Sequence, residues 1–143
     1  MKRAEFNRFC KSLPATTHVE QWGGSDVWKV GGKVFAICGW DESNVPGITF
    51  KVSDIAYDML KERPGLRPAP YLASRGMKWI QRFGKPGLST NDLRAYLTAS
   101  HRIVAAGLSK KARVAIGLSE PEATSLHRPA RKSPTRRRKG AAR

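Results

Sequence analysis

The chain has 143 residues, with 27 Lys and Arg against 11 Asp and Glu, a formal net charge of +16 and an isoelectric point of about 10.7. This length allows one domain, or one domain with a tail, and excludes a catalytic barrel of roughly 250 residues. The apolar fraction of 40% argues against disorder of the whole chain. We expect no secretory leader, and no apolar run of the sequence is long enough to span a membrane.

Residues 3–13 predict a helix that ends at Pro14. The apolar side chains of this segment recur at helical spacing on one face: Phe6, Phe9, Cys10 and Leu13. The two cysteines, Cys10 and Cys38, are too few for a disulfide framework or a metal set. We expect them to be reduced thiols in the core of a cytoplasmic protein, which could associate with the nucleoid.

Residues 17–52 predict a meander of three or four antiparallel strands. Gly31-Gly32 separates two runs rich in β-formers, which is typical of a two-residue hairpin turn. The strict alternation of apolar residues over Ile48–Val52 predicts a further strand. By the same alternation, we expect Trp28 to point into the core.

The second half of the domain predicts two more helices and a strand. Ser53 is a candidate N-cap for a helix over residues 54–61, and Ser89 for a helix that runs to about Leu108. A proline-rich link and a strand over residues 77–83 lie between them. This order of elements predicts an α+β fold with helices packed on one face of an antiparallel sheet.

Charge and composition divide the chain near its C-terminal quarter. Residues 1–108 carry a net charge of +7, and residues 109–143 carry +9. After about Leu118 prolines recur without an apolar period, so this segment cannot bury enough surface to order itself. We therefore predict a domain over residues 1–115 and a disordered basic tail over residues 116–143.

The domain resembles the YjbR/MmcQ family, whose fold is CyaY-like (frataxin-like). The resemblance rests on the order and spacing of several segments: Trp28–Ala36, Ile48–Val52, Pro68–Leu72, Lys78-Trp79, and a closing helix with Leu93, Leu97, Ser100 and Val104. The chain departs from the family pattern at His101, where we expect Tyr. The resemblance implies a bacterial protein that binds DNA through a double-wing surface of sheet and loops.

Basic residues interleaved with aromatic ones favour nucleic-acid binding by the domain. The aromatic residues in question are Trp28, Trp79 and, as a third candidate, Trp40. The predicted binding residues of the domain are Lys29, Lys33, Lys51, Arg75, Lys78, Trp79 and Arg82. Alternation places Lys29 and Lys51 away from their apolar neighbours. The alternative is an ordinary solvated sheet face, because lysines also protect sheet edges.

The tail is a second candidate for phosphate contacts. Its predicted binding residues are Arg131, Lys132, Arg136, Arg137, Arg138 and Lys139. Each phosphate that such a segment neutralises releases counterions, which makes binding depend on salt. A basic run of this kind also suits RNA or an anionic membrane surface, and the remaining alternative is a tail that only solubilises the protein.

The sequence contains no recognisable catalytic site. The three histidines are His18, His101 and His127, and Ser100 and His101 would point about 100° apart on a helix, so they cannot form a nucleophile–base pair. Acidic residues are scattered along the chain, so general acid–base catalysis by carboxylates has no visible site. We therefore expect no enzyme activity and no catalytic residues.

A metal or another cofactor is not expected either. The resemblance to frataxin-like proteins suggests iron binding through an acidic first helix, but the first helix here has a single carboxylate, Glu5, among four basic residues. That charge would repel a cation. The sequence thus favours a non-catalytic, largely sequence-nonspecific DNA-binding protein, with RNA as an alternative partner. The rival interpretation is a small protein- or metabolite-binding module with an incidental basic tail.

Overall fold

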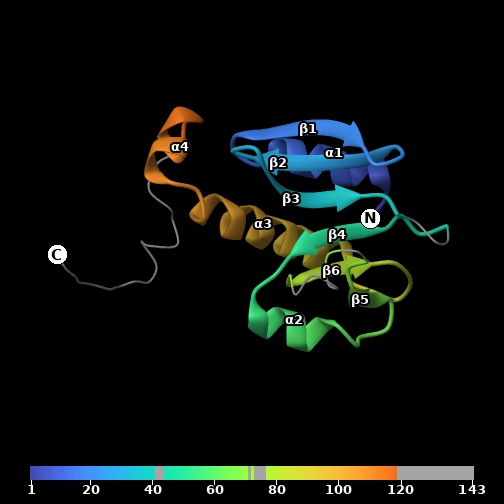
Figure 1. The fold of residues 1–143 in the computed structure, drawn as a ribbon. Coiled ribbons are helices and arrows are strands. Elements are labelled where there is room, and N and C mark those ends of the chain that lie inside the picture. The colour runs from blue at the N-terminus through green and yellow to red at the C-terminus, as the bar shows by residue number, and fades with distance from the viewer. Residues whose placement is uncertain (41–43, 71, 73–76, 119–143) are drawn as a thin grey trace.

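An antiparallel sheet of six strands forms the centre of the fold (Figure 1). The computed structural model describes residues 1–40, 44–70, 72 and 77–118. Within them the strands are β1 (Thr16–Gln21), β2 (Ser25–Val30), β3 (Lys33–Cys38), β4 (Ile48–Lys51), β5 (Leu66–Pro68) and β6 (Trp79–Arg82). They lie in the order β1-β2-β3-β4-β6-β5, and each neighbouring pair is antiparallel.

Four helices accompany the sheet in the described part of the chain: α1 (Arg3–Ser12), α2 (Asp54–Leu60), α3 (Thr90–Ala106) and α4 (Lys110–Ala115). The predicted caps are confirmed, because the Ser53 hydroxyl accepts the N–H of Ala56 at 3.2 Å and the Ser89 hydroxyl accepts that of Asp92 at 3.1 Å. In the described ranges, no helix combines the length and hydropathy that crossing a bilayer requires. The predicted α+β class is confirmed.

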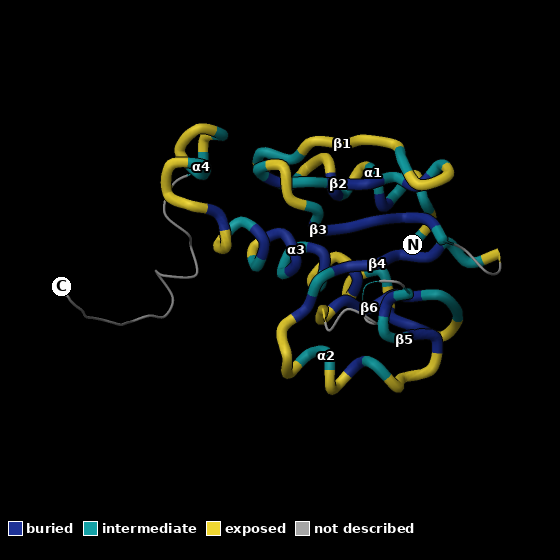
Figure 2. The backbone as a smooth tube through the Cα atoms, in the orientation of Figure 1, coloured by how far each residue is buried: buried dark blue, intermediate teal, exposed yellow. Residues whose placement is uncertain are grey.

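The main core lies between the sheet and the helices α1 and α3, which pack against the same face (Figures 1 and 2). Its largest side chains come from both layers: Phe6, Trp28, Phe35, Phe50, Leu93 and Leu97. Trp28 is buried, as alternation predicts, and its indole Nε1 donates to Asn7 Oδ1 at 2.9 Å. Cys10 and Cys38 are buried and free of disulfide, and burial raises the pKa of the Cys10 thiol.

Two short elements were not predicted from the sequence. Strand β5 lies in the proline-rich link and pairs with β6 at the edge of the sheet, where Pro68 is tolerated. Helix α4 begins after Ser109, whose hydroxyl accepts the N–H of Ala112 at 3.0 Å. Ile116 and Leu118 then pack against the core, three residues past the predicted boundary at 115. The rest of the predicted tail lies outside the described residues.

Candidate nucleic-acid interface

The second face of the sheet, opposite α1 and α3, carries the candidate site. Strand register aligns one row of its side chains across all six strands: Val19, Val27, Ile37, Thr49, Gln81 and Arg67. A second row contains the partners Lys29 and Val34 and, further along, the partners Lys51 and Trp79. We call the surface formed by these two rows the open face.

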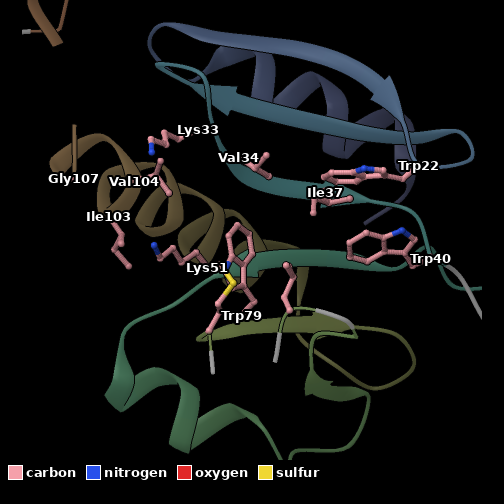
Figure 3. A pocket seen from close by; sticks show the side chains of 12 residues that line it. Trp22, Lys33, Val34, Ile37, Trp40, Lys51, Trp79, Ile103, Val104 and Gly107 are labelled. Carbon is pink, nitrogen blue, oxygen red and sulfur yellow. The ribbon is translucent and has the colours of Figure 1, made fainter. Parts of the chain in front are cut away.

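A hollow of about 460 Å³ lies on the open face (Figure 3). Three tryptophans and two lysines give it its chemistry: Trp22, Trp40, Trp79, Lys33 and Lys51. Ile37 and Val34 of β3 add to its apolar surface, as do Leu72 and Met77. Helix α3 contributes Ile103 and Val104, and Gly107 follows at its C-cap. The hollow thus joins an aromatic and apolar lining to two cations.

The hollow forms where β3 and β4 stop pairing with each other. Their register runs from Cys38↔Ile48 to Ala36↔Phe50 and ends there. Beyond it, the buried Ser100 of α3 bridges the two strands, because its hydroxyl donates to Phe35 O at 2.6 Å and accepts the N–H of Lys51 at 2.9 Å. The separated strands therefore keep their backbone groups satisfied, and α3 reaches the hollow from the core side.

Trp22 and Trp40 lie against each other at one end of the hollow, with ring centroids 5.8 Å apart and ring planes 31° from parallel. Both residues adopt left-handed backbone conformations, with φ of 56° and 57°. For a bulky side chain this conformation costs on the order of 1 kcal/mol or more. Trp22 nevertheless remains 51% exposed, so its indole presents a large aromatic surface to solvent.

The structure brings together four of the predicted binding residues. Lys33 and Lys51 line the hollow with Trp79, and Lys29 lies on the same face, next to Lys33 in the β2–β3 hairpin. Alternation predicts the side of Lys29 and Lys51. Lys33 is the register partner of the buried Val30, so alternation alone does not place it, and its side chain lines the hollow from the end of the hairpin. The role of these residues in binding stays a prediction.

The open face also contains residues that the sequence analysis did not select. Trp22 follows β1, and its role in the hollow depends on a backbone conformation that composition does not show. Arg67 of β5 donates from Nε to Gln81 Oε1 at 2.8 Å, and its guanidinium lies 4.6 Å from the centroid of the Phe83 ring. Recognising residues 66–68 as a strand would have placed Arg67 on this face, opposite Gln81.

Two predicted residues lie elsewhere. The Lys78 ammonium sits 4.6 Å from the centroid of the Tyr57 ring of α2. Arg82 is buried, and its Nη2 donates to Met1 O at 3.0 Å and to Pro46 O at 2.9 Å. Arg82 therefore links the N-terminus and the β3–β4 connection to β6, and it does not belong to the candidate surface.

Trp28 also lies off the open face, since its side chain is in the core. The predicted residue Arg75 and the six tail residues lie outside the described part of the chain: Arg131, Lys132, Arg136, Arg137, Arg138 and Lys139.

The indole Nε1 of Trp79, a residue 4% exposed, is buried on the open face and has no hydrogen-bond partner among the described residues. The same holds for Oγ1 of the fully buried Thr49. A buried donor left without an acceptor costs about 1–3 kcal/mol. Trp79 lines the hollow, so a ligand there that carries an acceptor oxygen could recover part of this cost.

Asp26 and His101 are titratable groups off the open face that have structural partners. Asp26 accepts bonds from Arg3 Nε at 2.6 Å and Asn7 Nδ2 at 3.0 Å, and lies 2.8 Å from His18 Nε2. Burial raises the pKa of Asp26, but the hydrogen bonds from Arg3, Asn7 and His18 outweigh it and hold the pKa at about 2. This carboxylate fastens α1 to β2.

His101 stands at the position where the family resemblance leads us to expect Tyr. Its Nε2–H donates to Pro14 O at 2.7 Å, and burial lowers the pKa of the imidazole. The neighbouring Ser100 hydroxyl is committed to the strand bridge. Across the described ranges, no group of three or more His, Cys, Asp or Glu side chains is arranged to hold a metal ion.

These features define the protein as an α+β domain in which one face of the sheet is both aromatic and basic. Within that class, the YjbR family model matches residues 11–103, and the chain belongs to this family. The predicted family membership is confirmed. No curated protein matches the chain.

Two crystal structures support the fold. A Deinococcus radiodurans protein with a DUF419 domain is 18% identical and superimposes with a TM-score of 0.70, over 87% of this chain and 94% of the other. A Pseudomonas syringae protein is 19% identical, with a TM-score of 0.59 over 73% of this chain and 99% of the other. At this identity the likeness concerns the fold alone.

Proposed function

We propose that this YjbR-family chain is a non-catalytic DNA-binding protein whose open face contacts phosphates without strong sequence preference. One observation carries the proposal: Lys33 and Lys51 line a hollow that also contains three tryptophans. Cations beside aromatic surfaces are what backbone-tracking nucleic-acid sites use. Lys29 extends the cationic surface along the β2–β3 hairpin.

Low sequence specificity follows from the elements involved. Base sequence is read mainly by side chains that a helix or ribbon carries into the major groove. The apolar faces of α1 and α3 are used against the sheet, and the candidate cations stand on strands and a hairpin. The basic tail, if it acts with the open face, would add phosphate contacts and affinity without adding base readout.

A second candidate function is binding of a small molecule or a short peptide. The observation that favours it is the hollow itself, whose volume of about 460 Å³ falls in the usual range of ligand pockets. In this alternative the basic tail would be incidental. Because both candidates use the hollow, they differ in whether affinity depends on phosphates and salt.

The proposal is tested by titrating labelled duplex DNA with the full chain and with residues 1–118 at two salt concentrations. We expect both proteins to bind, with a salt slope of about 0.9 per phosphate contact and a steeper slope for the full chain. Circular dichroism verifies that the shortened chain is folded. Binding by the full chain alone would assign DNA binding to the tail, and absence of binding by both would exclude the proposed function.

A further inference from the structure

We propose that the hollow accepts an unpaired base, so that the open face prefers single-stranded DNA to duplex DNA. This inference rests on the proposed function and names the form of DNA that the site takes. It is argued from the shape of the hollow, the exposed indole of Trp22, the unpaired donor on Trp79 and the charge of the rim.

The concave shape of the hollow favours an unpaired base over a duplex. In a duplex, base faces are stacked and only base edges and phosphates are accessible. The tryptophans of the hollow lie on a concave surface, and Trp22 and Trp40 stand side by side at one end of it (Figure 3). A base can reach these indole faces only if it leaves the stack, which single-stranded DNA permits at little cost.

The exposed indole of Trp22 offers an aromatic surface on which a base can stack. Trp22 is 51% exposed although it stands directly beside Trp40, at 5.8 Å between ring centroids. Neither the sheet nor a described helix covers the remaining indole surface. A base stacked on Trp22 would extend the existing aromatic pair, and such stacking tolerates any base because every base has a π-face.

The buried indole N–H of Trp79 is a donor that an occupant of the hollow could use. The Trp79 side chain lines the hollow, and its Nε1–H lacks an acceptor within the described chain. Carbonyl oxygens of bases and oxygens of the sugar–phosphate backbone are acceptors of the kind this donor needs. An occupant of the hollow that supplies such an oxygen would give this donor a bond that it does not make to any of the described residues.

The charge around the hollow favours an anionic occupant. Lys33 and Lys51 line the hollow and Lys29 lies beside it, and the described residues that line it include no carboxylate. This charge repels a second copy of a chain whose net charge is +16. It attracts a strand that brings both phosphates and aromatic bases.

The test compares three ligands on the unmodified full chain: an oligo-deoxythymidine strand, an abasic strand of the same length, and a duplex. We expect the thymidine strand to bind at least tenfold more tightly than the abasic strand and to quench tryptophan fluorescence. Equal binding of these two strands, or binding of the duplex as tight as that of the thymidine strand, would overturn the inference while leaving the proposed function intact. No binding of any of the three would overturn both.

Variants assign the effect to the hollow. We expect Trp22→Ala to weaken binding of the thymidine strand by roughly 5- to 150-fold, the range for loss of one stacked base, and to leave abasic-strand binding unchanged. Trp22→Phe should restore most of the affinity. Ile55→Ala, at a 74% exposed apolar residue of α2, is the matched control and should change nothing. An unchanged affinity in Trp22→Ala would overturn the inference.

Two further ligands test the commitment to a DNA strand. An RNA strand of matched length that binds more than tenfold more tightly than the thymidine strand would contradict it. So would free thymidine monophosphate with an affinity equal to that of the strand, because the hollow would then be a metabolite site.

Discussion

Ser100 shows how one side chain shapes the site. Its hydroxyl takes the place of a missing strand contact, since it joins Phe35 O and Lys51 N–H where β3 and β4 have separated. The residue is fully buried, so its hydroxyl makes these two bonds away from solvent. The position of Lys51 at the hollow therefore depends on Ser100 of α3, which binds the backbone of both strands from the core side.

We predict that Ser100→Ala lowers the free energy of unfolding by about 1–3 kcal/mol, because it leaves a buried N–H and a buried C=O unpaired. Chemical denaturation measures the change. Thr98→Ala is the control: its Oγ1 bonds only Arg94 O, on the exposed side of the same helix, and its loss should stay within about 0.5 kcal/mol. Equal effects of the two variants would contradict the bridge.

Asp26 predicts a pH dependence of stability. Its pKa is about 2 in the folded protein against 3.8 for the unperturbed group, so the unfolded chain takes up the proton first as pH falls. The carboxylate therefore stabilises the fold above about pH 4, and this contribution is lost between pH 4 and pH 2. Asp26→Asn should destabilise the protein on the order of 1–2 kcal/mol at pH 7.

Thermal unfolding of both proteins across this pH range measures the difference. It should shrink as pH falls through the window, because the native protein loses the charge that the variant already lacks. A difference that stays constant from pH 7 to pH 2 would show that Asp26 acts through packing alone.

Residue-scale placement was predictable where one rule decided it. Alternation placed Lys29 and Lys51 on the open face and Trp28 in the core. The same rule could not show that Arg82 would find two carbonyl acceptors from distant segments and become buried. Nor could it show the left-handed conformation of Trp22, because the sequence contains no Gly or Asn at that position to signal it.

At the scale of elements, the β2–β3 hairpin and the end of α3 hold each other in place. Gly31 and Gly32 have φ of 59° and 79°, the conformations that a two-residue turn demands. A Cβ on Gly31 would lie 2.5 Å from Cδ1 of the buried Leu108, whereas a Cβ on Gly32 would have nothing within 4 Å. The turn thus packs on Leu108 and carries Lys33 to the hollow.

We predict that Gly31→Ala destabilises the protein more than Gly32→Ala, by about 1 kcal/mol. Both substitutions introduce the strain of a positive φ, which costs about 1 kcal/mol, and only the first must also displace Leu108. Denaturation of the two variants in parallel gives the comparison. Equal destabilisation would mean that the turn does not bear on α3.

Elements were predictable from the sequence when they were long and periodic. The four strands of the meander and the helices α1, α2 and α3 have apolar spacing or caps that local physics explains. Strand β5 has three residues, one of them Pro68, and forms only because β6 offers it an edge. The separation of β3 from β4 depends on Ser100, which lies about fifty positions away in the chain.

At the scale of the whole molecule, the net charge of +16 has two sources that ask for different explanations. Part of it lies on the domain, where Lys29, Lys33 and Lys51 gather on the open face with the tryptophans. The remainder lies on residues 109–143, which include Lys110, Lys111 and Arg113 of the described helix α4. Composition alone predicted this division, but only the fold shows that the domain's cations meet an aromatic hollow.

The most direct test of this account separates the open face from simple net charge. Two full-length variants each change the charge equally: Lys33→Glu with Lys51→Glu in the hollow, and Arg8→Glu with Lys11→Glu on the exposed side of α1. Their affinity for labelled single-stranded DNA is measured at two salt concentrations.

We predict that the hollow variant loses at least tenfold in affinity and lowers the salt slope by about 1.4, the slope of two phosphate contacts on a single strand. The α1 variant should remain close to the unmodified protein. Equal losses in both variants would contradict the account, because DNA binding would then follow total charge and not the open face.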